Sequence, residues 1–106
     1  MKSLDLTFFN NATWSVTMPN GLKLEVKKPS QKLLRVLNEK IKDVDSEKDA
    51  TVQLQKLQAL TSIILINNKG DVVIDEEVMD SMTTDMLYAI YFGYQEFVSE
   101  VVTNPN

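Results

Sequence analysis

The chain has 106 residues, of which 43% are hydrophobic and 25% are charged, a composition typical of one globular domain. Its net charge of −4 argues against a nucleic-acid surface, because such surfaces depend on clustered cations. The absence of cysteine excludes disulfides and thiolate metal sites, and the absence of histidine removes the commonest general base and metal ligand. We therefore expect a single domain over residues 1–106 that is no enzyme, needs no cofactor and binds no nucleic acid.

The first 28 residues alternate apolar and polar side chains with the period of two that is typical of half-buried strands. Three short strands are expected, and their apolar positions are Leu4, Leu6 and Phe8, then Ala12, Trp14, Val16 and Met18, then Leu22, Leu24 and Val26. Consecutive strands joined by short loops pair in an antiparallel meander. The sequence thus predicts a three-stranded meander over residues 1–28, with one apolar face that other elements must cover.

The loop lengths set the register of this meander. With Pro19-Asn20-Gly21 as a three-residue loop, Val16 faces Leu24 and Trp14 faces Val26, whereas a shift by one residue would place apolar side chains on opposite faces. Gly21 is then the left-handed residue of the turn. The same rule predicts a three-residue loop over residues 9–11 between the first two strands.

The following part of the same domain, residues 30–102, is expected to be helical. Ser30 is a fair N-cap for a first helix that ends near Asp43, and a second helical pattern runs from about Val52 to about Asn67. Gly70 is expected in the left-handed conformation that stops this helix.

Two further helices follow an extended segment over residues 72–74. Asp75 can cap a short helix through about Ser81, Thr83 or Thr84 can cap the last one, and residues 103–106 read as a frayed tail. The predicted fold class is α+β, with the N-terminal meander packed on three to four C-terminal helices.

The last helix, residues 84–102, carries more apolar surface than one side of a small core requires. At about 100° per residue, one stripe consists of Leu87, Ile90, Tyr91, Tyr94, Phe97, Val98 and Val101. A second stripe consists of Tyr88, Phe92 and Val102, and the remaining polar strip of Asp85, Ala89, Gly93, Glu96 and Glu100. The apolar arc spans roughly 200°, where about 100° serves a helix that packs on one side. Such a helix is either surrounded by its own protein or shared with a partner, so the second stripe is a candidate partner-binding surface.

Three methionines are secondary candidates for partner binding. Met79, Met82 and Met86 follow one another at helical spacing, and flexible, polarisable side chains suit adaptable binding surfaces. The alternative is that they fill gaps beneath the sheet.

The acidic connector over residues 43–49 resembles a calcium loop only in part. Acidic residues occupy its alternate positions, but Lys48 stands where the sharp turn needs glycine, and Leu54 stands where a bidentate glutamate is required. We therefore read it as a solvated helix connector and expect no metal site.

The longest apolar run, Ile63-Ile64-Leu65-Ile66, is far short of the roughly 20 residues that span a membrane. Near the N-terminus, Asp5 interrupts any apolar signal region. A soluble, cytoplasmic protein without a membrane partner is expected.

The chain combines a small meander, helices rich in leucine and lysine, the acidic helix start Asp75-Glu76-Glu77 and the aromatic run over residues 87–97, LYAIYFGYQEF. In the order and spacing of these elements it resembles the short tail assembly chaperones of long-tailed bacteriophages and prophages of Gram-positive bacteria. The resemblance implies a non-enzymatic protein of the bacterial host cytoplasm that coats apolar segments of the tape-measure protein and helps recruit tail-tube subunits. Self-association through the same surface is expected. The alternative is a small structural or adaptor subunit that is retained in a virion or another complex.

Overall fold

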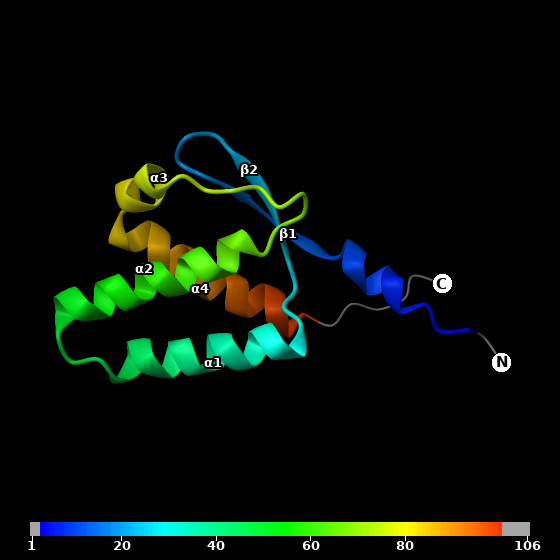
Figure 1. Ribbon diagram of the computed structural model, residues 1–106, viewed down its shortest axis with the longest axis horizontal. Coiled ribbons are helices and arrows are strands. Elements are labelled where there is room, and N and C mark those ends of the chain that lie inside the picture. Colours follow the sequence, from blue (N-terminus) through cyan, green and yellow to red (C-terminus); the bar gives the residue numbers. More distant parts are fainter. Residues whose placement is uncertain (1–2, 101–106) are drawn as a thin grey trace.

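The computed structural model describes residues 3–100 of the chain (Figure 1). Their elements in chain order are the 3₁₀ helix η1 (Leu6–Asn11), the strands β1 (Thr13–Thr17) and β2 (Lys23–Lys27), and the helices α1 (Gln31–Ser46), α2 (Ala50–Ile66), α3 (Glu76–Ser81) and α4 (Thr84–Ser99). The α+β class is confirmed, with a two-stranded antiparallel sheet in place of the predicted three strands. The predicted tail and Val102 lie outside the described residues.

The β1–β2 hairpin has the predicted register. Val16 lies opposite Leu24, and Trp14 lies opposite Val26. The Met18 amide donates to the Leu22 carbonyl at 2.7 Å, which closes the three-residue turn. Gly21 has a φ of +88°, so its predicted left-handed conformation is also confirmed.

The predicted first strand is wrong, and the segment forms η1 instead. The Asp5 carboxylate accepts hydrogen bonds from the Thr7 amide at 3.0 Å and the Thr7 hydroxyl at 2.6 Å, which caps the 3₁₀ turn. Such local side-chain bonds compete with strand pairing. Leu4 and Leu6 are 74% and 67% exposed, so the apolar residues that predicted a buried strand face do not pack in the core.

A short segment after α2 takes the third place in the sheet, on the other side of β2. Asn68 forms an isolated antiparallel bridge with Val26, the Lys27 amide donates to the Asn67 carbonyl at 2.9 Å, and the Lys69 amide donates to the Glu25 carbonyl at 2.8 Å. Gly70 has the predicted left-handed conformation, with a φ of +85°, but α2 already ends at Ile66, so Gly70 turns the chain after the bridge and does not stop the helix. One edge of β2 is thus covered from α2, and β1 is left as the outer strand.

Three of the helix N-caps are the predicted residues. Ser30 Oγ accepts from the Leu33 amide at 3.1 Å, Asp75 accepts from the Glu77 amide, and Thr83 Oγ1 accepts from the Met86 amide at 3.2 Å. These bonds satisfy amides that lack partners in the first helical turn.

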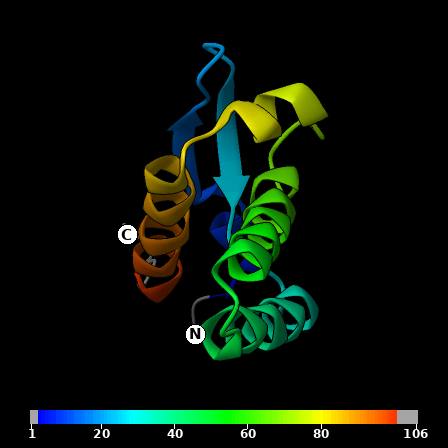
Figure 2. The ribbon, with the colours of Figure 1, turned by 90° about the vertical axis from the view of Figure 1, so that its left-hand side faces the viewer.

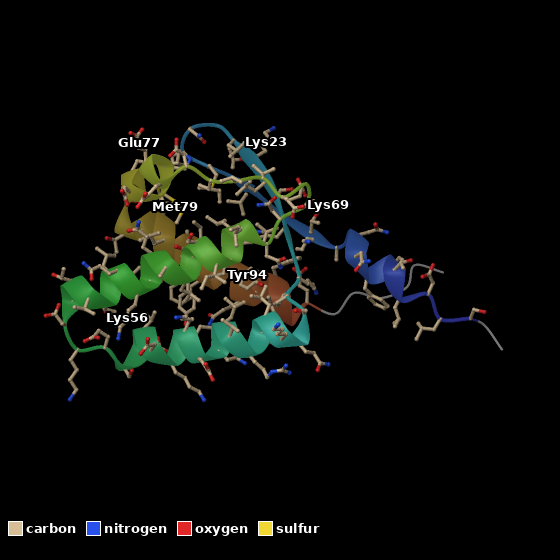
Figure 3. All side chains as sticks on the ribbon, viewed as in Figure 1. Lys23, Lys56, Lys69, Glu77, Met79 and Tyr94 are labelled. Carbon is tan, nitrogen blue, oxygen red and sulfur yellow. The ribbon has the colours of Figure 1, made fainter. Side chains whose placement is uncertain are left out.

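The first helix is one turn longer than predicted and ends at Ser46. Lys56 of α2 pairs with Asp43 at 3.4 Å and with Glu47 at 2.8 Å (Figure 3). The hydrogen bond from Lys56 is the main cause that lowers the pKa of the Glu47 carboxyl. The acidic connector is therefore bound to a lysine of this chain.

α2 packs against α1, α4 and β2, so the core lies around it (Figures 1 and 2). The buried apolar residues are Met18, Leu24, Val26, Leu37, Val44, Leu57, Leu60, Ile64, Leu65, Met79, Leu87, Ile90, Tyr91, Tyr94 and Phe97. They come from β2, from all four α-helices and, with Met18, from the hairpin turn, and the half-buried Trp14 and Val16 of β1 pack against them, so the sheet and the helices share one core.

Gly93 lies against an aromatic ring, contrary to its predicted place in a polar strip. A Cβ atom at this position would lie 2.6 Å from Trp14 Cζ2, well inside van der Waals contact. Glycine is therefore required here by the close approach of β1 to α4.

We expect Gly93→Val to lower the free energy of unfolding by about 1–3 kcal/mol, the usual cost of overpacking, although valine is the better helix former. The only tryptophan of the chain is Trp14, so its emission should shift in the same variant. Denaturant titration followed by tryptophan fluorescence measures both. Unchanged stability together with an unchanged spectrum would contradict this packing.

Candidate functional site

Helix α4 has a different neighbour on each of its flanks (Figure 2). Of the stripe predicted to be core, Leu87, Ile90, Tyr91, Tyr94 and Phe97 are buried as expected, Val98 is half-buried, and Val101 lies outside the described residues. On the β1 side the rings of Trp14 and Phe97 stack at 6.3 Å. On the other side, residues of α4 and α1 line a shared groove. Of the second stripe, Tyr88 is half-buried and Phe92 is exposed.

Tyr88, Tyr91 and Phe92 form a continuous cluster of rings, here called the aromatic surface. Phe92 is 59% exposed, and its ring stacks on Tyr88 with centroids 5.9 Å apart and an angle of 19° between the ring planes. Tyr91 supports the same ring at 5.2 Å. The Phe92 ring is thus held by contacts with two tyrosine rings and still exposes a large apolar area to solvent. An apolar side chain that is both ordered and exposed is suited to contact a partner protein. Val102, the third predicted member of this stripe, lies outside the described residues.

The groove between α1 and α4 has a volume of about 250 Å³ and is lined by residues such as Leu34, Ile41 and Val98. Tyr94 also lines it (Figure 3), and within residues 3–100 its buried hydroxyl has no hydrogen-bond partner. Burial raises the pKa of Tyr94 to about 12. Burial, and next the nearby Asp45 carboxylate, raise the pKa of Tyr91. Because both pKa values are raised above the usual value for tyrosine, neither ring adds a negative charge to this flank of α4 at physiological pH.

The three methionines are placed differently from one another. Met79 is buried between α3 and α2, where it lies among Ala59 and Ser62 (Figure 3). Met82 is half-buried, and Met86 is 41% exposed. The gap-filling alternative therefore describes Met79, and only the other two reach the surface.

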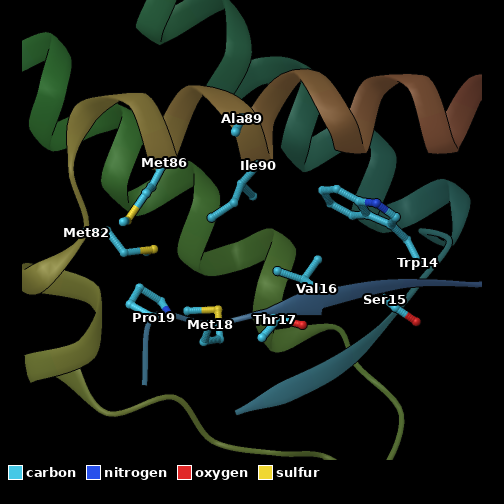
Figure 4. A pocket seen from close by; sticks show the side chains of 10 residues that line it. All are labelled: Trp14, Ser15, Val16, Thr17, Met18, Pro19, Met82, Met86, Ala89 and Ile90. Carbon is cyan, nitrogen blue, oxygen red and sulfur yellow. The ribbon is translucent and has the colours of Figure 1, made fainter. Parts of the chain in front are cut away.

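Met82 and Met86 line a second groove, which lies between α4 and β1 (Figure 4). We call it the methionine groove; its volume is about 350 Å³, and its lining residues are Trp14, Ser15, Val16, Thr17, Met18, Pro19, Met82, Met86, Ala89 and Ile90. None of these residues is charged. The groove combines apolar side chains with the backbone of a strand, and only its two methionines were indicated by the sequence.

Residues 3–100 bring together no group of three or more carboxylates that could hold a metal ion. Nor does that part of the chain contain a helix long and apolar enough to cross a bilayer. The features that stand out are therefore the aromatic surface and the methionine groove, which lie on different flanks of α4 and consist of uncharged side chains.

No relative was identified. Comparisons with protein-family models, with curated proteins and with solved structures find no match for this chain.

The sequence pattern indicated Tyr88 and Phe92 but missed Trp14, Val16 and Ala89. Their signal was present as the period-two face of β1 and the small residues of α4. It could not be interpreted without knowing how β1 lies against α4, where Trp14 packs closely on Gly93.

Proposed function

We propose that this protein is a non-enzymatic assembly chaperone of the phage tail type, which binds apolar helical segments of a client protein through its aromatic surface. The observation that carries the proposal is the exposed Phe92 ring, held in place by Tyr88 and Tyr91. A helix presenting apolar residues at i, i+3, i+4 and i+7 would bury this ring against its own apolar stripe.

The groove between α1 and α4 supports this mode of binding. Its lining continues the apolar surface from α4 to Leu34, which is itself on the exposed side of α1. The resemblance of the sequence to tail assembly chaperones points to the tape-measure or tail-tube protein as the client. The same surface would also permit self-association.

We expect Phe92→Ser to abolish capture of an apolar helical client while changing the free energy of unfolding by about 0.5 kcal/mol or less, as is usual for exposed positions. Pull-down from a phage-infected or induced lysogenic host, with tail proteins identified by mass spectrometry, measures capture. Recovery of no tail component by the unaltered protein would overturn the proposed client.

Mass spectrometry of purified particles separates the chaperone from a structural subunit. A chaperone is released before the particle is complete and should be absent, whereas a structural or adaptor subunit should be present at a fixed ratio. A subunit that stays in the finished particle is the competing function, because a chaperone and a structural subunit both need an exposed apolar surface.

A further inference from the structure

We propose that the methionine groove binds an extended, apolar segment of another protein that carries basic residues at its ends, and that this segment pairs with β1 as an added strand. This is a second surface, independent of the aromatic surface on the opposite flank of α4. Three observations carry it: the direction of the β1 backbone, the lining of the groove, and the charge around it.

The outer edge of β1 offers backbone groups that no strand in residues 3–100 pairs with. β2 bonds to the segment after α2 through Glu25 and Lys27, so these residues direct their backbone groups away from β1. Their register partners are Ser15 and Thr13. Because bonded and non-bonded pairs alternate along an antiparallel ladder, Thr13, Ser15 and Thr17 direct their N–H and C=O groups to the open edge.

The groove lies at this edge. Consecutive residues from Trp14 to Pro19 line it, although their side chains alternate between the two faces of the sheet. This is possible only where the strand backbone itself borders the groove. An added strand would lie about 4.8 Å from β1, and its alternate side chains would meet Met86 and Ile90 (Figure 4).

The side chains opposite β1 favour an apolar segment of variable sequence. Met82 and Met86 are flexible and adapt to side chains of different shape (Figure 4). Specificity must then come from the backbone pairing and from charges beside the groove.

On the α4 side of the groove those charges are negative, whereas the neighbouring strand β2 carries lysines such as Lys23, the register partner of Thr17. Asp85 and Glu96 stand four residues before and seven residues after the groove residue Ala89, so they share its face of α4. After Lys69 the sequence contains no lysine or arginine, whereas acidic residues recur from Asp71 to Glu100. A segment with basic ends is complementary to this rim, whereas a second copy would bring the same acidic rim against it.

The probe is a capped peptide of about ten residues in which valine alternates with threonine and lysines stand at both ends, long enough to cover the edge of β1. Trp14, the only tryptophan, lines the groove and reports binding through its emission. We expect saturable binding to the full chain, weakened about tenfold or more in Met86→Lys, which adds a like charge to the groove. Ala89→Lys, at an exposed position, is the second variant and should act in the same direction.

Two altered peptides test the mode of binding. N-methylation of the residues that face β1 should abolish binding, because it removes the donors of the added strand. Glutamate in place of lysine at both ends should weaken binding about tenfold at low salt. Equal binding of the methylated peptide, or of the glutamate peptide, would overturn the inference.

The aromatic surface is tested separately. Phe92→Ser should bind the extended peptide within about twofold of the unaltered protein, since Phe92 does not line the methionine groove. A helical amphipathic peptide should show the reverse pattern, with loss in Phe92→Ser and retention in Met86→Lys. A protein dimer that Met86→Lys converts to monomer would assign the groove to a second copy and overturn the proposed occupant.

Discussion

Phe97→Ala is expected to lower the free energy of unfolding by about 3–5 kcal/mol, the usual cost of removing a buried phenyl ring. Phe97 is 7% exposed and stacks on Trp14 at 6.3 Å with an angle of 25° between the ring planes. Tyr94 packs beside it at 6.3 Å, and the Lys28 ammonium lies over the ring at 5.3 Å from its centroid. Its loss would open a cavity between β1 and α4.

Chemical denaturation of Phe97→Ala and Phe92→Ser, measured side by side, checks this expectation. The two residues lie on the same helix, but only Phe97 is buried, so Phe92→Ser is the control for loss of an aromatic residue from α4. Should the two variants be destabilised equally, Phe92 would be a core residue, and the main argument for the aromatic surface would fail.

Asn68→Ala is expected to lower the free energy of unfolding by about 2–4 kcal/mol, because buried polar groups would lose their partners. Asn68 is 1% exposed. Its Nδ2 donates to the carbonyls of Leu65 at 2.8 Å and Val72 at 2.9 Å, and its Oδ1 accepts from the Val72 amide at 2.8 Å. The Asn68 side chain thus fixes the turn that joins α2 to the extended segment after it. The same turn covers the edge of β2.

Asn67→Ala is the matched control. Asn67 is half-buried, and its side chain makes only a long contact of 3.4 Å with the Lys27 carbonyl, so we expect a loss of about 1 kcal/mol or less. Thermal and denaturant unfolding of both variants give the comparison. If both variants lost the same free energy of unfolding, the three Asn68 hydrogen bonds would not stabilise the fold more than the single long contact of Asn67 does.

Local features of the fold could be predicted because they depend on residues a few positions apart. The caps at Ser30 and Thr83 follow from the preference of hydroxyl oxygens for the amides of a first helical turn. The hairpin register follows from a short turn and from the need to keep Trp14 and Val16 on one face. Burial of Tyr94 and Phe97 follows from helical periodicity.

The candidate surfaces were predictable only in part. The width of the apolar arc on α4 indicated an excess of apolar area, and Phe92 does lie in that excess. Periodicity gives the angle of a residue about its helix axis, however, and not what lies opposite. It therefore could not separate buried Met79 from exposed Met86, nor show that Gly93 accommodates Trp14.

By itself, the sequence determined the α+β class, the hairpin with its glycine turn, the order of the helices and the wide apolar arc of α4, because each depends on local propensity or periodicity. Only the tertiary structure decided which segment lies beside β2 and which edge stays open. The alternation over Leu4 and Leu6 predicted a strand as strongly as that of β1. In the structure, however, the Asp5 carboxylate stabilises a local 3₁₀ turn there. Asn68, just after the end of α2, forms the bridge at the edge of β2 that faces away from β1. Which segment pairs with the hairpin depends on the relative free energies of contacts between residues far apart in the sequence. Those free energies depend on which surface the assembled core leaves uncovered, and a local pattern does not contain that information.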